Sequence, residues 1–210
     1  MTAFITHCWK NARLDTAALL LCVVLACVGV RPVQAEPAVE VTQLKVEASQ
    51  DGVLLTAALR FDVPTAVEEA LLKGVAVYFV AEADIYRERW YWADKKVAAV
   101  ERHMRLAFHP LTRRWRLAVS PNLIANTGLG VILNQSFDSL GEAMVVVRRI
   151  ANWRIAELSE IEPGVRHRLE FRFRLDVAQL PRPLQIGALG QSDWMLSTAV
   201  SQRLALEGLK

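Results

Sequence analysis

Residues 165–177 alternate between apolar and charged side chains with a strict period of two. Such alternation predicts a β-strand with one buried face and one face in water. The expected buried face carries Val165, His167, Leu169, Phe171, Phe173, Leu175 and Val177. The expected wet face carries Arg166, Arg168, Glu170, Arg172, Arg174 and Asp176. A strand of this kind requires a second layer that covers its apolar side.

A β-hairpin is predicted over residues 39–61. Apolar positions alternate over 39–48, where their phase slips near Gln43, and again over 53–61. Between the two runs lies an Asp-Gly pair, which is typical of a tight turn between antiparallel strands. Weaker alternation predicts further strands, the first of which ends in an aromatic and charged stretch. These strands are expected over 75–92, 96–109, 115–119 and 192–199.

Two helices are predicted, over 64–73 and 137–152. Pro64 suits the first helical position of the former, and Gly74 is typical of the residue that ends a helix. In the latter, apolar residues recur at helical spacing, and Ser139 is typical of a helix cap.

The pattern as a whole predicts about seven or eight strands and two helices. The run 180–184 contains two prolines, so we expect it to be extended and outside any central strand. Residues 122–135 show no clear period, because Gly128 and Gly130 interrupt it. Short turns favour antiparallel neighbours. The expected fold class is therefore α+β, mainly β, with one antiparallel β-sandwich-like domain.

The first 35 residues are organised like a secretory signal peptide. Lys10 and Arg13 form a basic start, 16–30 carry no charge, and Ala35 ends a typical cleavage site. The uncharged run has 15 residues, fewer than the roughly 20 that span a bilayer. Two alternatives stay open. In one, the segment is not cleaved and anchors the protein in the inner membrane, and in the other, the protein is a lipoprotein modified at Cys27.

We therefore expect a signal peptide over 1–35, a single β-rich domain over 36–210, and a periplasmic location. All three cysteines lie in the leader, so the domain must be held by its core rather than by disulfides. The chain has 25 basic and 22 acidic residues. Three basic residues and one acidic residue lie in the leader, which leaves 22 and 21. A domain so close to neutral is not expected to bind nucleic acid.

Arginine outnumbers lysine by 19 to 6 and clusters with aromatic residues. Guanidinium groups bind carboxylates and phosphates through paired hydrogen bonds and also stack on aromatic rings. The expected partners are an envelope protein, an anionic lipid or a cell-wall polymer. The candidate binding residues are Arg87, Arg89, Trp90, Trp92, Arg114 and Trp115.

Neither a catalytic signature nor a metal-binding signature is present in the sequence, and no cofactor is expected. Asp84, Glu88 and Glu101 lie near the aromatic stretch, and two carboxylates across a groove can hydrolyse a glycosidic bond. Cross-strand pairing of these carboxylates with arginines is the simpler expectation. His103 and His109 would lie roughly 20 Å apart on one strand, too far to share a metal ion.

Several short runs resemble those of a known family. They are 70–79, 89–92, 106–112 and 180–185, followed by Trp194 and Ser197. Together with the leader, they resemble an uncharacterised family of bacterial secreted proteins catalogued as domain-of-unknown-function family 4390. The resemblance implies a bacterial envelope protein and carries over no activity and no catalytic residue.

These features predict a non-enzymatic periplasmic or cell-envelope binding module whose ligand is unknown. Two other hypotheses remain open. One is an enzyme that modifies an envelope polymer through a carboxylate pair. The other is a carrier of an apolar ligand between the two layers, which requires a cavity of about 300 Å3 or more.

Overall fold

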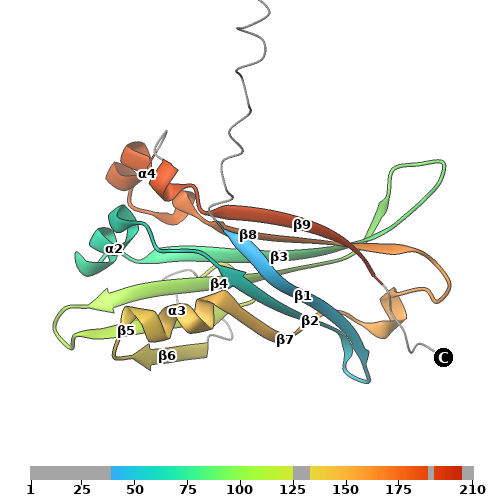
Figure 1. Ribbon diagram of the computed structural model, residues 1–210, viewed down its shortest axis with the longest axis horizontal. Helices are drawn as coiled ribbons and strands as arrows, with labels where there is room; N and C mark the ends of the chain where they lie inside the picture. Colours follow the sequence, from blue (N-terminus) through green and yellow to red (C-terminus); the bar gives the residue numbers. More distant parts are fainter. Residues whose placement is uncertain (1–38, 125–132, 189–191, 205–210) are drawn as a thin grey trace, which may run out of the picture. The chain divides into compact units, whose positions relative to one another are not determined.

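The computed structural model describes residues 39–124, 133–188 and 192–204 (Figure 1). The predicted signal peptide and all three cysteines lie outside these residues, as does the segment that contains Gly128 and Gly130. The described strands form two antiparallel sheets that pack around one core. The prediction of a mainly β, sandwich-like α+β domain is confirmed.

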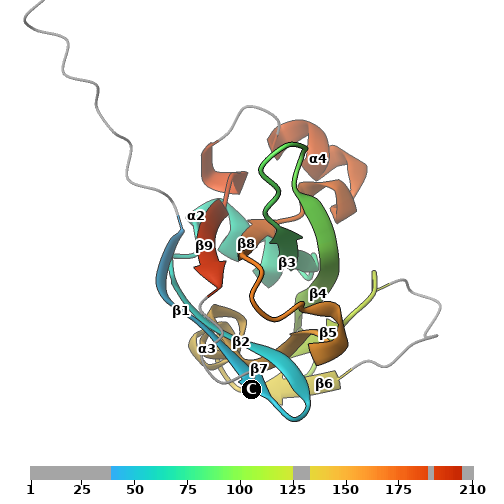
Figure 2. The ribbon, with the colours of Figure 1, turned by 90° about the vertical axis from the view of Figure 1, so that its right-hand side faces the viewer.

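The larger sheet has six strands in the order β6-β5-β4-β3-β8-β9, and the smaller has three in the order β1-β2-β7. Figure 2 shows β1, β2 and β7 on one side of the core and β9, β8, β3 and β4 on the other. The strands are β1 Glu40–Ser49, β2 Gly52–Arg60, β3 Val77–Arg87, β4 Lys95–His109, β5 Arg114–Ser120, β6 Leu133–Phe137, β7 Arg149–Ala156, β8 His167–Leu175 and β9 Ser197–Leu204. The helices are α2 Thr65–Leu72, α3 Leu140–Arg148 and α4 Arg182–Ala188, with 3-10 turns η1 Leu158–Glu160, η2 Val177–Gln179 and η3 Ser192–Trp194.

The β1–β2 hairpin has the predicted register. The pairing shifts between Val41 and Gln43, where the apolar phase slips in the sequence. Gly52 has a φ of +119°, and a Cβ at this position would lie 2.5 Å from the carbonyl oxygen of Ala156 in β7. Only glycine fits here, because the backbone is left-handed and the neighbouring strand approaches too closely for a side chain.

The core lies between the inner faces of the two sheets, as the alternation in β8 predicts. Leu169, Phe171 and Phe173 of that strand are all fully buried. Phe173 packs against Phe79 of β3 and against Phe61, which directly follows β2, with ring centroids 5.9 and 5.5 Å apart. The aromatic cluster therefore joins the two sheets.

The predicted helix over 137–152 is too long. The structure has α3 over Leu140–Arg148, capped by Ser139, whose Oγ accepts a hydrogen bond from the Glu142 backbone N–H at 3.2 Å. From Arg149 the chain is β7, which pairs with β2. The helical spacing of apolar residues continues past Arg148 by coincidence, and the long-range partner decides the conformation there.

The prediction of an extended chain over 180–184 is also wrong. The α4 helix begins at Arg182, and the backbone N–H groups of Leu184 and Gln185 donate to the Pro181 carbonyl. Proline is tolerated in the first turn of a helix because its missing N–H has no partner within the helix. The last strand is displaced as well, since it covers Ser197–Leu204 and the segment before it contains the η3 turn.

The α2 helix is confirmed, with one small difference. Pro64 lies directly before it as the cap residue, rather than at its first helical position. The buried stripe is Val67, Ala70 and Leu71, and Gly74 ends the helix region with a φ of +83°.

Arg102 interrupts the apolar inner face of β4. It pairs in register with the fully buried Ala81 of β3, and residues directly opposite each other share one face of a sheet. Its Nε is buried and has no hydrogen-bond acceptor among the described residues. Burial lowers the pKa of Arg102 below its ordinary value, because the charged form loses hydration.

We expect Arg102→Met to raise the free energy of unfolding by about 1 kcal/mol, because it removes a buried donor that has no partner. Urea unfolding of the variant and the parent measures the change. Arg105→Met is the control on the same strand, since the Nε of Arg105 donates to the Tyr78 hydroxyl at 3.3 Å. The control is expected to lose up to about 1 kcal/mol. A loss of similar size at Arg102 would contradict the prediction.

Candidate functional site

Residues 88–94, named here the aromatic loop, connect β3 to β4. The predicted long strand over 75–92 ends at Arg87, so its aromatic part lies in this loop instead. Trp90, Tyr91 and Trp92 are 84%, 71% and 78% exposed. In Figure 1 the loop stands out from the right-hand end of the sheet, at the β3–β4 connection. Three neighbouring aromatic side chains thus lie in water at one end of the domain.

The base of the aromatic loop is held by hydrogen bonds and ion pairs. The Asp94 carboxylate accepts a hydrogen bond from the Arg89 backbone N–H at 3.3 Å and from the Arg168 guanidinium at 2.8 Å. The Glu88 backbone N–H donates to the Arg166 carbonyl at 3.0 Å, and the Glu88 carboxylate lies 3.7 Å from Arg203. The loop is therefore anchored to β8 and β9 at its base, while its aromatic tip has no such bonds within the described residues.

Positive charge surrounds the aromatic loop. Arg89, Lys95 and Arg166 are exposed and have no ion pair in the part of the chain that the structure describes. Arg87 differs, because its Nη1 lies 2.6 Å from a carboxylate oxygen of Glu162. The loop and its base therefore present uncompensated cations beside exposed aromatic rings.

The other two candidate binding residues do not join this loop. Arg114 pairs with His109 at the far end of β4, whereas Lys95 starts that strand beside the loop. A strand of 15 residues is on the order of 45 Å long. Arg114 bonds to Asp138 at 2.6 Å. Trp115 is only 6% exposed and packs against Phe108 at 4.9 Å, so it belongs to the core, contrary to our expectation of a surface residue.

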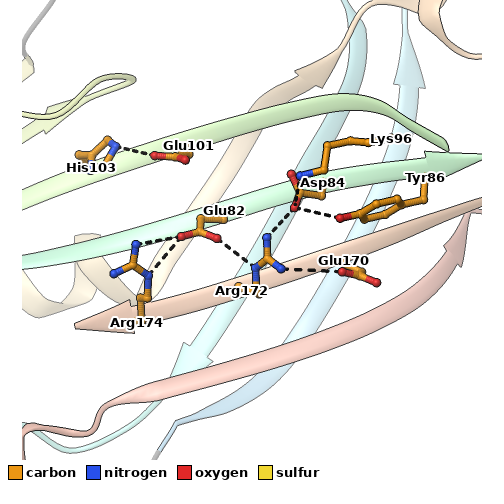
Figure 3. A network of polar contacts seen from close by, with 9 residues as sticks. All are labelled: Glu82, Asp84, Tyr86, Lys96, Glu101, His103, Glu170, Arg172 and Arg174. Atoms are coloured by element: carbon orange, nitrogen blue, oxygen red, sulfur yellow. Dashed lines mark hydrogen bonds and ion pairs between the residues drawn. The ribbon is translucent and has the colours of Figure 1, made fainter. Parts of the chain in front are cut away.

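A network of charged side chains covers the outer face of β3, β4 and β8 (Figure 3). Asp84 is almost fully buried, and its Oδ2 lies 2.5 Å from Arg172 Nη2 and 3.0 Å from Lys96 Nζ. Arg172 also donates to Glu82 at 3.0 Å, and Glu82 accepts two further bonds from Arg174 at 3.1 Å. Each carboxylate of this group thus has cationic partners.

The network continues to the base of the aromatic loop. Arg168 bonds to Asp94 in the loop and lies 3.1 Å from Glu170, which is itself 3.9 Å from Arg172. The guanidinium of Arg168 also lies 5.5 Å from the centroid of the Tyr86 ring. Arg168 therefore couples the loop to the paired charges of the sheet.

The electrostatics of the network favour its ionised form. The hydrogen bond to Asp84 is the main reason why the pKa of Lys96 is raised above its ordinary value. Burial lowers the pKa of Arg172, but its bond to Glu82 and the charges of Asp84 and Glu82 outweigh this, so the net pKa is raised. Paired charges of this kind order a surface.

The three carboxylates considered for catalysis each have a basic partner. Asp84 is paired with Arg172 and Lys96, Glu88 lies beside Arg203, and Glu101 accepts a bond from His103 at 2.9 Å. Asp84 and Glu101 lie on the same face of neighbouring strands, because Asp84 pairs in register with Ala99, two residues before Glu101. Of the three, only Glu101 lines the cleft between β4 and β7, so that cleft does not hold the facing pair that glycoside hydrolysis requires.

The histidines are likewise dispersed. The Nδ1 of His167 bonds to the Val165 carbonyl at 3.0 Å, His103 is buried beside Glu101, and His109 is exposed at the end of β4. Over residues 39–124, 133–188 and 192–204, no three His, Cys, Asp or Glu side chains lie close enough to hold a metal ion.

A cleft of about 510 Å3 opens between β4 and β7, where the first half of β4 extends past its neighbour β5. Its walls combine Glu101, His103 and Arg154 with apolar residues such as Val100, Leu123 and Trp153, so it is an open groove of mixed character. Between the layers, Phe61, Phe79 and Phe173 pack against one another, with ring centroids 5.5 to 6.2 Å apart. The arrangement offers no support for an apolar carrier that holds its ligand between the sheets.

Comparison with known proteins places this sequence in a family. A model for the family described as Domain of unknown function (DUF4390) matches residues 36–203. The protein belongs to this family. No curated protein and no solved structure matches the chain. Within the described part of this DUF4390 domain, no helix has both the length and the apolar character needed to cross a membrane.

Three residues at or beside the aromatic loop were not among the binding residues predicted from the sequence. They are Tyr91, Lys95 and Arg166. For Tyr91, the sequence of this DUF4390 domain did offer a signal, which is the run of three consecutive aromatic residues. Successive side chains of a strand point to opposite faces, so at least one residue of such a run lies outside a single buried face. Arg166 has no such signal, since only the pairing of β3 with β8 brings it beside the loop.

Proposed function

We propose that the protein is a non-enzymatic binding module of the bacterial cell envelope, with the aromatic loop as its contact surface. The observation that carries this proposal is the exposure of Trp90, Tyr91 and Trp92 together on a loop with an anchored base. Contiguous exposed apolar groups on a folded domain mark interaction sites. Tryptophan and tyrosine are enriched at such sites because they combine a large apolar body with a polar tip.

The pattern of residues 1–35 supports the location in this proposal. A basic start, an uncharged run and a small residue at the end are typical of export. Cleavage after Ala35 releases the domain into the periplasm, and the alternative of an uncleaved anchor leaves it in the same compartment. In either case the aromatic loop meets envelope components rather than cytosolic ones.

A fractionation experiment tests both parts of the proposal. The full chain with a tag at its C-terminus is produced in its own host, and the N-terminus of the recovered protein is sequenced. We expect the protein to begin at Glu36 and to be retained with the envelope fraction. The Trp90→Ser/Trp92→Ser variant is expected to move to the soluble periplasmic fraction, because it lacks the contact side chains.

Leu111→Ser is the matched control. Leu111 is a fully exposed apolar residue in the turn between β4 and β5, at the opposite end of β4 from the aromatic loop. This variant is expected to be retained like the parent. Recovery of the protein from the cytosol with Cys8 still present would overturn the location, and equal retention of the loop variant would overturn the contact surface.

A further inference from the structure

We infer that the partner of the aromatic loop is the surface of an anionic lipid bilayer, an inference that rests on the proposed function. Tryptophan and tyrosine favour the boundary between headgroups and acyl chains, because their rings are apolar and their N–H or O–H groups remain hydrated. Trp90, Tyr91 and Trp92 supply three such rings in one short loop. A loop of this composition partitions into the interface without crossing the membrane.

The charges next to the rings match an anionic surface. Arg89 lies in the loop, Lys95 begins β4 directly after it, and Arg166 is bonded to the loop through its backbone carbonyl. All three are exposed, and none forms an ion pair within the described residues. Basic groups beside an inserted apolar element are attracted to anionic headgroups over about a Debye length. The two kinds of side chain therefore act on the same partner.

The shape of the site separates a bilayer from the other envelope partners. Two clefts of the domain lie along β4 and β7, and neither is lined by a residue of the aromatic loop. A polymer chain or an extended peptide is held in a groove, whereas this loop stands out from the end of the sheet in Figure 1. A protruding aromatic tip with cations at its base fits a broad, soft, anionic surface.

The base of the loop keeps the tip in position for this contact. Asp94 is bonded to both Arg89 and Arg168, and Arg168 continues into the charge network of the sheet. Anchoring of this kind lowers the conformational entropy that docking must remove from the loop. The three rings therefore reach the bilayer together.

Co-sedimentation with vesicles tests the inference. The parent and each variant are purified from the envelope or soluble periplasmic fraction that holds them, and N-terminal sequencing confirms that all begin at the same residue. Each protein is then mixed with vesicles of phosphatidylcholine alone or of phosphatidylcholine with phosphatidylglycerol. We expect the protein to bind the anionic vesicles. In 0.5 M salt the bound amount is expected to fall to a small fraction, because salt screens the cations and the Debye length shortens to about 4 Å.

Two sets of variants separate the rings from the charges. Trp90→Ser/Trp92→Ser is expected to reduce binding at least about tenfold on anionic vesicles. Arg89→Gln/Lys95→Gln/Arg166→Gln is expected to reduce it by about tenfold on anionic vesicles and to leave any binding to neutral vesicles unchanged. Leu111→Ser is expected to bind like the parent, and thermal unfolding shows whether each variant keeps the fold.

The outcomes distinguish this inference from the proposed function. If the parent binds neither type of vesicle, or if the loop variant binds as tightly as the parent, the lipid inference is wrong. If vesicle binding fails while the loop variant is still released from the envelope in the fractionation experiment, the contact surface stands and its partner is another envelope component. If the variant stays with the envelope as well, both proposals fail.

Discussion

Phe173→Ala is expected to lower the free energy of unfolding by about 3–5 kcal/mol. Phe173 is fully buried and packs against Phe79 in the same sheet and against Phe61 beside the opposite one. Truncation to alanine removes the apolar surface that these rings cover, and it leaves a cavity that the two sheets close only in part. Urea or thermal unfolding followed by circular dichroism measures the loss.

Two further variants separate the cavity from the loss of the aromatic ring. Phe173→Leu keeps most of the volume and is expected to cost clearly less than the alanine variant. Leu111→Ala removes an equally apolar side chain from a fully exposed position and is expected to change stability by no more than about 0.5 kcal/mol. A cost below about 1 kcal/mol for Phe173→Ala would show that the two layers do not depend on this cluster.

Asp84→Ala is expected to lower the free energy of unfolding by about 2 kcal/mol. Asp84 is only 4% exposed and is the shared partner of Arg172 and Lys96, so its removal leaves two cations without their common counter-ion. The cost stays below that of a fully buried pair, because Arg172 and Lys96 are about half exposed and Arg172 retains Glu82. Unfolding in urea measures the change.

The exposed pair between Arg60 and Glu40 is the matched control. Its side chains are also in direct contact but are 74% and 51% exposed. Arg60→Ala is therefore expected to cost no more than about 1 kcal/mol, because water replaces the partner at the surface. A double-mutant cycle of Asp84→Ala with Arg172→Met should yield a coupling energy of about 1–3 kcal/mol. Equal costs for the buried and the exposed pair would contradict the structural role assigned to Asp84.

The charge network bears on the aromatic loop as well as on stability. Arg168 joins Asp94 in the loop to Glu170, which lies beside Arg172. The charges near Asp84 are thus connected to the loop through Arg168, although none of them belongs to the loop itself. We therefore interpret the outer face of β3 and β8 as the structural support of the loop, rather than as a second binding site.

Much of the fold could be predicted from local pattern. The buried face of β8, the shift near Gln43 and the helix after Pro64 were all confirmed. Each of these depends on which of a few neighbouring side chains are apolar and which are polar, or on the backbone preferences of proline and glycine. The failures lie where a distant partner decides the conformation, as at β7, which is a strand because β2 pairs with it.

The candidate site was predictable only in part. Trp92 and Trp115 both lie near arginines in the sequence, yet one is in water and the other is in the core. Trp115 occupies a strand position that faces Phe108, whereas Trp92 follows the end of the paired part of β3. Both are tryptophans close to arginines in the sequence, and the difference came from where the strand pairing ends.

The sequence by itself determined the alternation that makes this a two-layered, mainly β domain, and it determined that aromatic residues and arginines lie together near residue 90. These are properties of neighbouring residues, since side-chain period and turn chemistry act over a few positions. Only the tertiary structure decided that β3 ends at Arg87, that Arg166 meets the loop, and that Asp84 is enclosed by cations. Those facts depend on which strands pair and in which register, and pairing joins segments up to about 100 residues apart in the chain.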